Sequence, residues 1–170
     1  MAKMFPDHPN LEGGFAPIHM EVDAPDLVVE GEIPKELRGV FFRNGPNPQF
    51  SPRGDYHWFG GDGMIHGFYF SDGKVSYRNR YVKTVKWKKE KEEGRSLFAA
   101  FNPMDSDESV MGMETDGLAN TNIVYHAGKL LALEEAHAPF ELDPLSLESI
   151  GSHDFDGKFT GPMTAHPKID

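Results

Sequence analysis

Three pairs of short extended segments, each joined by a tight turn, run along this chain and constrain its fold more than any other feature. In the first pair, residues 67–70 and 75–82 flank Ser71-Asp72-Gly73-Lys74, and an Asp-Gly dipeptide supplies the positive φ angles of a tight strand reversal. The other two pairs join residues 122–125 to 130–133 and residues 140–142 to 146–150. Consecutive antiparallel hairpins predict an all-β fold, and their meander order is typical of propeller blades.

The rest of the chain predicts short elements between turns. Residues 28–34 read as a short strand broken by Gly31 and Pro34, residues 35–38 as one helical turn, and residues 40–43 as extended structure. The mixed-charge run of residues 83–95 predicts a solvated loop or a short helix.

A competing interpretation of the charged run involves a membrane surface. Trp87, its neighbouring lysines and the apolar residues 97–101 would then make a weak peripheral contact with lipid. The net charge of −10 opposes strong binding to anionic lipids, and it also argues against nucleic acid, whose phosphates need clustered cations.

Composition narrows the chemistry that the chain can perform. The 170 residues include 18 Gly and 13 Pro, which favours turn-rich strand structure. They include no Cys, so histidine and carboxylate are the available metal ligands. The first residues lack the apolar run of a signal peptide, and no stretch approaches the ~20 apolar residues of a membrane span, so a cytoplasmic location is expected.

His166 is the strongest candidate metal ligand. It precedes Pro167, which favours extended backbone at His166 and cannot donate in a central strand, so we expect the imidazole to project from a strand end. One imidazole cannot hold a catalytic metal alone.

Four motifs in a fixed order carry a family resemblance. They are Phe42-Arg43-Asn44-Gly45-Pro46-Asn47-Pro48, Gly61-Asp62-Gly63-Met64-Ile65-His66, Leu131-Ala132-Leu133-Glu134-Glu135 and Ala165-His166-Pro167-Lys168. With them, the chain resembles the N-terminal third of a carotenoid cleavage oxygenase. The resemblance runs over residues 18–170 and leaves residues 1–17 as an N-terminal extension. It implies two to three blades of a seven-bladed β-propeller, whereas the hairpins alone also fit an open β-sandwich fragment.

The resemblance implies a non-haem iron(II) dioxygenase that splits an alkene bond of a carotenoid or apocarotenoid into two carbonyl products. Its partners would be dioxygen and an apolar substrate held in a tunnel. His166 matches the first of four iron-binding histidines, and Glu135 matches a carboxylate outside the ligand shell that would orient a histidine absent from this chain. Strand alternation places Glu134 and Glu135 on opposite faces, and both could otherwise be ordinary solvated charges.

Other polar residues are assigned architectural roles. His66 and Asp62 share a motif, but the resembled family does not use it at the iron, so a tight turn is the preferred interpretation. Arg43 and Asn44 are expected to bond loop carbonyls. The remaining histidines lack chelating spacing and are expected in loops or at the surface: His8, His19, His57, His126, His137 and His153.

Three alternatives stay open. Relatives of the same fold cleave stilbene-type phenylpropanoids; in that family a lysine precedes the outer glutamate, and here Glu134 stands in its place. Retinoid isomerisation is a further activity of the wider family. The chain could also be a non-catalytic propeller fragment, because three further histidines would have to come from outside it.

Overall fold

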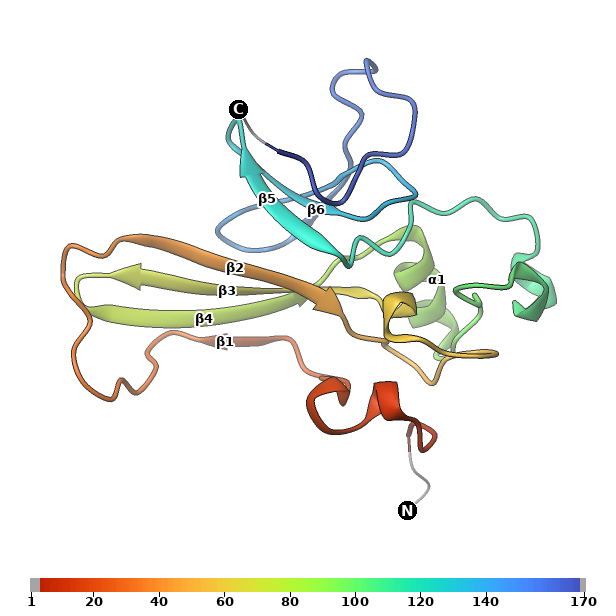
Figure 1. The fold of residues 1–170 in the computed structure, drawn as a ribbon, viewed down its shortest axis with the longest axis horizontal. Coiled ribbons are helices and arrows are strands. Elements are labelled where there is room, and N and C mark those ends of the chain that lie inside the picture. Colours follow the sequence, from red (N-terminus) through yellow and green to blue (C-terminus); the bar gives the residue numbers. More distant parts are fainter. Residues whose placement is uncertain (1–3, 169–170) are drawn as a thin grey trace.

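The computed structural model describes residues 4–168, which form two four-stranded antiparallel sheets (Figure 1). The first sheet has the order β1-β4-β3-β2 and the second the order β5-β6-β7-β8. The strands are β1 (Val22–Ala24), β2 (Gly39–Pro46), β3 (Gly63–Ser71), β4 (Lys74–Tyr81), β5 (Asn122–His126), β6 (Lys129–Leu133), β7 (Phe140–Leu142) and β8 (Ser149–Ser152). Residues 1–3 belong to the predicted N-terminal extension (residues 1–17), and residues 169–170 to the end of the predicted propeller part (residues 18–170). Both lie outside the described residues.

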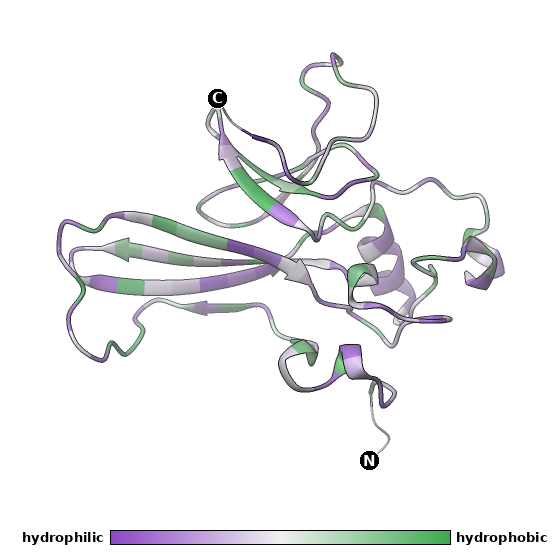
Figure 2. Cartoon of the chain, in the orientation of Figure 1, coloured by the Kyte–Doolittle hydropathy of each residue, from purple (hydrophilic) through white to green (hydrophobic). Residues whose placement is uncertain are grey.

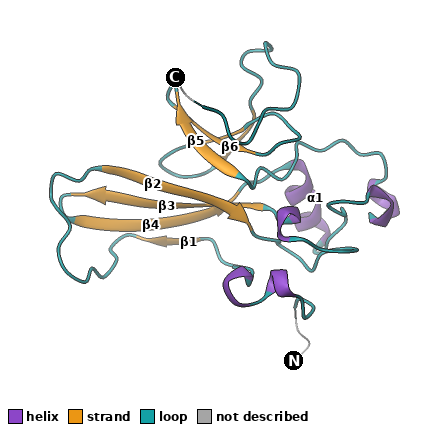
Figure 3. Cartoon of the chain, in the orientation of Figure 1, coloured by secondary structure: helices purple, strands orange, loops and turns teal. Residues whose placement is uncertain are grey.

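Helical structure is sparse (Figure 3). One α-helix, α1 (Val85–Glu93), lies among the described residues, together with short 3₁₀ turns. These turns are η1 (Pro9–Leu11), η2 (Gly13–Phe15), η3 (Trp58–Gly60), η4 (Pro103–Asp105) and η5 (Glu108–Val110). No helix among residues 4–168 combines the length and apolar character needed to cross a bilayer.

The first two predicted hairpins are confirmed. At the β3–β4 turn, Asp72 has φ 52° and Gly73 φ 76°; at the β5–β6 turn, Ala127 has φ 49° and Gly128 φ 81°. Ser71 pairs with Lys74 across the first turn, so the loop holds two residues. Positive φ angles at both central residues match the twist of the flanking strands.

The third hairpin has a longer connection than predicted. β8 begins at Ser149, three residues after the expected start at Ser146. The Asp143 carboxylate accepts hydrogen bonds from the N–H groups of Leu145 (3.0 Å) and Ser146 (2.6 Å), which fold these residues into a turn. The Ser146 bonds, from N–H and hydroxyl, hold the pKa of Asp143 below its usual range.

The predicted strand over residues 28–34 is wrong. This segment has no ladder partner, and Val28 is 96% exposed. The N-terminal strand of the first sheet is instead β1, which pairs with the outer edge of β4. The expected helical turn is present as a single bond from Leu37 N–H to the Pro34 carbonyl (3.0 Å).

The main core lies between the two sheets. One face of β3, through Ile65, packs on the second sheet, where the partners are fully buried aliphatic and aromatic side chains. These are Leu130, Ala132, Phe140, Leu142 and Leu147, with Val82 and Ala119 alongside and Phe42 and Ile123 at the margin. Each fully buried Leu, Ile or Phe contributes about 1.5–3 kcal/mol, so this interface ties the sheets together.

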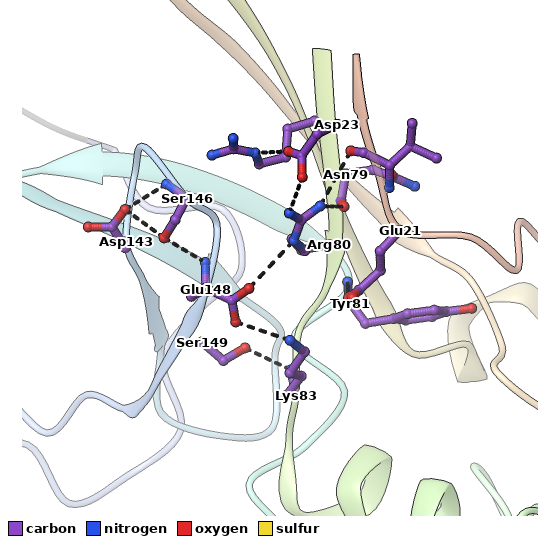
Figure 4. Close-up of polar contacts among 12 residues, drawn as sticks. Glu21, Asp23, Asn79, Arg80, Tyr81, Lys83, Asp143, Ser146, Glu148 and Ser149 are labelled. Carbon is purple, nitrogen blue, oxygen red and sulfur yellow. Dashed lines mark hydrogen bonds and ion pairs between the residues drawn. The ribbon is translucent and has the colours of Figure 1, made fainter. Parts of the chain in front are cut away.

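A polar network crosses the outer side of the same interface (Figure 4). Arg80 of β4 contacts Asp23 of β1 (2.7 Å) and Glu148 before β8 (3.5 Å). Lys83 contacts the second Glu148 oxygen (3.1 Å) through its side chain and Ser149 Oγ (2.9 Å) through its N–H. The Asp23 and Glu148 carboxylates are half-exposed, so the network orients the sheets more than it stabilises them.

The charged run does form a helix. Thr84 caps α1 by accepting the Trp87 N–H (3.2 Å), and Gly94 ends it in the left-handed region with φ 68°. Figure 2 shows a mostly hydrophilic helix, yet Lys86 and Glu90 are buried, so the expectation of full solvation is wrong.

Asp62 is the reason for that burial. Lys86 Nζ lies 2.8 Å from Asp62 Oδ1 and 2.7 Å from Glu90 Oε2. Burial alone would lower the pKa of Lys86, but attraction from Asp62 and Glu90 outweighs it and raises that pKa. Glu90 also accepts the N–H groups of Leu97 (2.8 Å) and Phe98 (3.0 Å), which anchors the chain after the helix.

Candidate active site

A cleft of about 730 Å³ opens where β2, β5 and β6 meet. Its walls come from segments far apart in the sequence. They are Gly14 and Phe15, residues 43–46, Trp58 and Phe59, Phe101, Asn120 and Thr121, residues 134–136, and His166. The structure therefore brings both sequence-predicted site residues, Glu135 and His166, to one cavity.

His166 reaches the cleft from an irregular segment. Ala165 is fully buried against Leu131 and Leu133 of β6, and its carbonyl accepts a hydrogen bond from Asn122 Nδ2 (2.8 Å). The expected strand end is wrong for the described residues, because the His166 N–H binds Thr164 Oγ1 (3.2 Å) and Pro167 has no N–H to offer a ladder. The imidazole is 66% exposed.

Glu135 is the carboxylate beside that imidazole. Its Oε1 lies 3.6 Å from His166 Nε2, just beyond direct hydrogen-bond range. Glu135 is 59% exposed and lies just past the end of β6. That Glu135 orients a histidine ligand outside this chain stays a prediction.

Glu134 differs sharply from its neighbour, because only 11% of its side chain is exposed. One carboxylate oxygen accepts the Leu118 N–H (2.9 Å), and the other contacts His137 Nδ1. The interpretation of Glu134 as an ordinary solvated charge is therefore wrong. Sequence reasoning assigned His137 no role, although its spacing of three residues from Glu134 was a usable signal.

Two asparagines fix the base of the cleft. Asn44 Nδ2 donates to the carbonyls of Ala119 (2.8 Å) and Asn122 (2.9 Å), which joins β2 to the start of β5. Asn120 Nδ2 donates to the carbonyls of Phe59 (2.7 Å) and Gly61 (2.6 Å). The expected loop-carbonyl bonding of Asn44 is confirmed.

Arg43 does not share that role. Its backbone pairs with His66 of β3, but among residues 4–168 no hydrogen bond or ion pair of its guanidinium is found, and the residue is exposed at the cleft wall. It also borders a second groove of about 610 Å³, together with His66, Phe68 and Tyr77. Arg43 is thus the cation available to both surfaces.

The other motif histidine has a protein partner. His66 Nδ1 lies 2.7 Å from the Tyr77 hydroxyl, whereas Asp62 is engaged by Lys86. Burial, with a smaller contribution from Arg43, lowers the pKa of His66. The preferred tight-turn interpretation is wrong for residues 63–66, because they belong to β3 and pair with β2. The contacts above occupy both His66 and Asp62.

Of the remaining histidines, two cap short helices. His8 and His57 accept backbone N–H groups at the starts of η1 and η3. His153 lies in the loop after β8, as expected, but only 13% of its side chain is exposed and its Nδ1 lies 3.0 Å from Glu141 Oε2.

Aromatic side chains make the apolar part of the cleft, a feature that sequence reasoning did not single out. Phe15 and Trp58 have ring centroids 5.3 Å apart, and Trp58 and Phe59 lie 5.2 Å apart. Phe101 adds a fourth ring. The adjacent aromatic residues 57–59 were the signal available in the sequence. By contrast, Leu97 is fully buried and Trp87 packs on Tyr81, so two of the side chains assigned to a lipid contact face the protein.

The donor set fits one corner of a metal site. Within residues 4–168 no three His, Cys, Asp or Glu side chains come together in a group that could hold a metal ion. His166 offers one exposed imidazole and Glu135 one nearby carboxylate. An iron held by four imidazoles would need three more ligands than this chain supplies.

Comparison with known proteins agrees with this geometry. A family model described as retinal pigment epithelial membrane protein matches residues 15–170. Lignostilbene-alpha,beta-dioxygenase isozyme III of Sphingomonas paucimobilis is 48% identical over 98% of this chain and 34% of its own length. Carotenoid cleavage oxygenase 1 of Neurospora crassa is 44% identical over 95% of this chain and 31% of its own length.

A solved structure extends the comparison to the fold. The lignostilbene dioxygenase of Pseudomonas brassicacearum superposes with a TM-score of 0.92 at 38% identity, covering 99% of this chain and 36% of that one. The chain therefore spans about a third of the length of the relatives that it matches.

Proposed function

The chain belongs to the carotenoid oxygenase family, and from this premise we propose that the whole protein is an iron(II)-dependent oxygenase that cleaves an alkene bond. One carbon–carbon double bond would break, and each carbon would take one atom of dioxygen to give two carbonyl products. The observation that carries the proposal is the meeting of Glu135 and His166 at one wall of an aromatic-lined cleft.

His166 would supply one ligand to the iron, since its imidazole is exposed at the cleft and its backbone is anchored by Thr164 and buried Ala165. Bound iron would supply the activation of dioxygen. Glu135 would offset part of the charge on a four-imidazole site and accept a ring N–H from a histidine outside this chain. The two sheets described here would form two blades of a seven-bladed propeller that brings the other ligands to the same point.

The substrate is expected to be apolar and conjugated. Four aromatic rings line the cleft and would hold such a molecule by stacking and exclude water from it. Fixing one double bond over the bound oxygen is a positioning effect, which can contribute several kcal/mol without acid–base chemistry. Carotenoids and apocarotenoids fit this description and are the first candidate class.

Phenylpropanoid alkenes are the second candidate class. The 48% identity to a lignostilbene dioxygenase favours them. The charge at Glu134 opposes them, because a carboxylate beside the cleft does not stabilise an ionised phenol. Incubation of the iron-loaded protein with an apocarotenal and, separately, with resveratrol, followed by identification of the aldehydes formed, tests both classes.

Iron content tests the site itself. In the full-length protein, His166→Ala should lower bound iron, whereas His126→Ala, which changes an exposed residue at the end of β5, should not. Equal iron in the two variants would remove His166 from the ligand set. Glu135→Gln should lower activity or iron retention roughly 10–100-fold if Glu135 orients a ligand.

The non-catalytic alternative concerns the 170-residue chain alone. With one imidazole at the cleft, this chain by itself should neither retain iron nor cleave either substrate. The coding sequence beyond Asp170 decides whether further strands with histidines follow. A chain that cleaves an alkene unaided would contradict the four-histidine proposal.

A further inference from the structure

Glu134 lies at the cleft with 11% of its side chain exposed, and each of its carboxylate oxygens contacts the protein. Oε2 accepts the Leu118 N–H (2.9 Å), and Oε1 contacts His137 Nδ1. Glu135, the next residue, is 59% exposed and makes one long contact with His166. Two of the roughly four acceptor positions of the Glu134 carboxylate are therefore taken by the protein, one on each oxygen.

Gly117 shows that the backbone is shaped around this arrangement. It has φ +86°, a conformation that favours glycine, and a Cβ at this position would lie 2.3 Å from Glu134 Oε1 and 2.6 Å from His137 Nδ1. Real Cβ atoms essentially never come this close, so a side chain at residue 117 would force the Glu134 carboxylate and the His137 imidazole to shift.

The same group of residues joins the segments that carry the two predicted site residues. The Leu133 carbonyl, just before Glu134, accepts the Thr121 N–H (3.0 Å). The His137 carbonyl accepts the Met163 N–H (3.1 Å), three residues before His166. Contacts therefore run from the segment at Leu118, through residues 134–137, to the segment that ends in His166.

We propose that Glu134 is a positioning residue, which with Gly117, Leu118 and His137 holds Glu135 and His166 at a fixed separation across the cleft wall. This inference rests on the proposed function. It differs from a role in substrate binding, because it assigns the Glu134 carboxylate to the protein backbone and to His137. The name clamp is used below for these four residues: Gly117, Leu118, Glu134 and His137.

Two readouts in the full-length protein test the clamp. The first is hydrogen exchange at the Leu118 amide, which needs no substrate. The second is the separation of kcat from KM in the iron-loaded enzyme. Glu134→Gln keeps an oxygen for the Leu118 N–H and an amide donor for His137, whereas Glu134→Leu keeps neither. Gly117→Ala perturbs the clamp without touching a carboxylate, and Glu148→Gln is the control for a carboxylate remote from the cleft.

We expect the Glu134→Leu and Gly117→Ala variants to exchange the Leu118 amide at least roughly 10-fold faster and to lose roughly 10-fold or more in kcat, with little change in KM. Glu134→Gln and Glu148→Gln should behave as wild type in both readouts. If Glu134→Leu does not fold, Gly117→Ala and His137→Ala decide by the same exchange measurement.

Three results would overturn the proposal. They are unchanged Leu118 exchange in Glu134→Leu, wild-type kcat in Gly117→Ala, or an effect of Glu134→Leu confined to KM, which would indicate substrate contact. A wild-type protein inactive on every alkene would defeat the proposed function, whereas the exchange result would still decide whether the clamp exists.

Discussion

Lys86→Met is a substitution for which the structure predicts a large loss of stability. Lys86 Nζ contacts Asp62 at 2.8 Å and Glu90 at 2.7 Å, and the two carboxylates are 3% and 1% exposed. Each contact corresponds to a gross attraction of about 6 kcal/mol at an effective dielectric constant near 20, most of which is offset by desolvation of the three charges. The measurable quantity is therefore the cost of removing one partner.

Removal of the ammonium would leave two buried carboxylates without their cation. The free energy of unfolding should fall by about 3–5 kcal/mol, measured by urea denaturation with an unchanged m-value. Lys88→Met, an exposed position on the same helix, is the matched control and should change it by less than about 0.5 kcal/mol. Neutralising all three groups together, with Asp62→Asn and Glu90→Gln added, should recover a large part of the loss. A loss below about 1 kcal/mol for Lys86→Met would refute the reasoning.

The sign of the pH dependence follows from the raised pKa of Lys86. The stability that it contributes is complete below its unfolded value of 10.5 and disappears as the pH rises through the higher folded value. Alkaline unfolding of the wild type should therefore steepen above about pH 10.5. The Lys86→Met variant should lack this component, and identical alkaline profiles would contradict the assignment.

Three further predictions concern stability. Ile65→Ala should lower the free energy of unfolding by about 2–5 kcal/mol in urea, because the side chain is fully buried between the sheets, and a smaller loss would indicate that the core collapses to fill the space. Glu148→Gln should change it by less than about 1 kcal/mol, with the difference vanishing in high salt, since the carboxylate is 56% exposed. His66, whose pKa is lowered in the folded state, contributes stability that is present above pH 6.5 and lost as the pH falls through the folded value. His66→Gln should flatten that acid limb, and an unchanged slope in an acid titration would rule out His66 as its source.

Local turn chemistry made the hairpins predictable. Asp72-Gly73 is a dipeptide that favours positive φ angles, and Gly128 adopts them without steric cost, so both turns could be recognised from sequence. Ala127 takes φ 49° although alanine does not favour it. Val28 and Val29 illustrate the opposite case. Their β-branched side chains favour strands, but a strand needs a ladder partner, and β4 is occupied by β1 instead.

Burial of charge was not predictable from spacing. Lys86 and Glu90 are four residues apart, which predicts a surface ion pair on a helix. Asp62, which precedes β3, adds a second carboxylate to this pair and makes it a buried cluster. Nothing in the sequence of residues 83–95 indicates that Asp62 lies beside them.

The candidate site divides in a similar way. Glu135 and His166 were identified by motif, and the structure places both at one cleft. The role of Glu134 depends on the Leu118 N–H and on the space left by Gly117, which has no Cβ. Both residues belong to a segment distant in the sequence. Glu134 and Glu135 therefore lie in different environments. Alternation along a strand predicts that neighbours face opposite sides, but not which partners each side chain meets.

The position of β1 at the outer edge of the first sheet has a consequence for biosynthesis. Val22 is 57 residues from Asn79, whose side-chain oxygen accepts its N–H, so β1 leaves the ribosome well before its partner and stays unpaired until β4 has followed it. At 5–20 residues per second this delay lasts about 3–11 s. A nascent strand of three residues with a charged Asp23 at its centre is a poor template for pairing with other chains, which suits a segment that must wait.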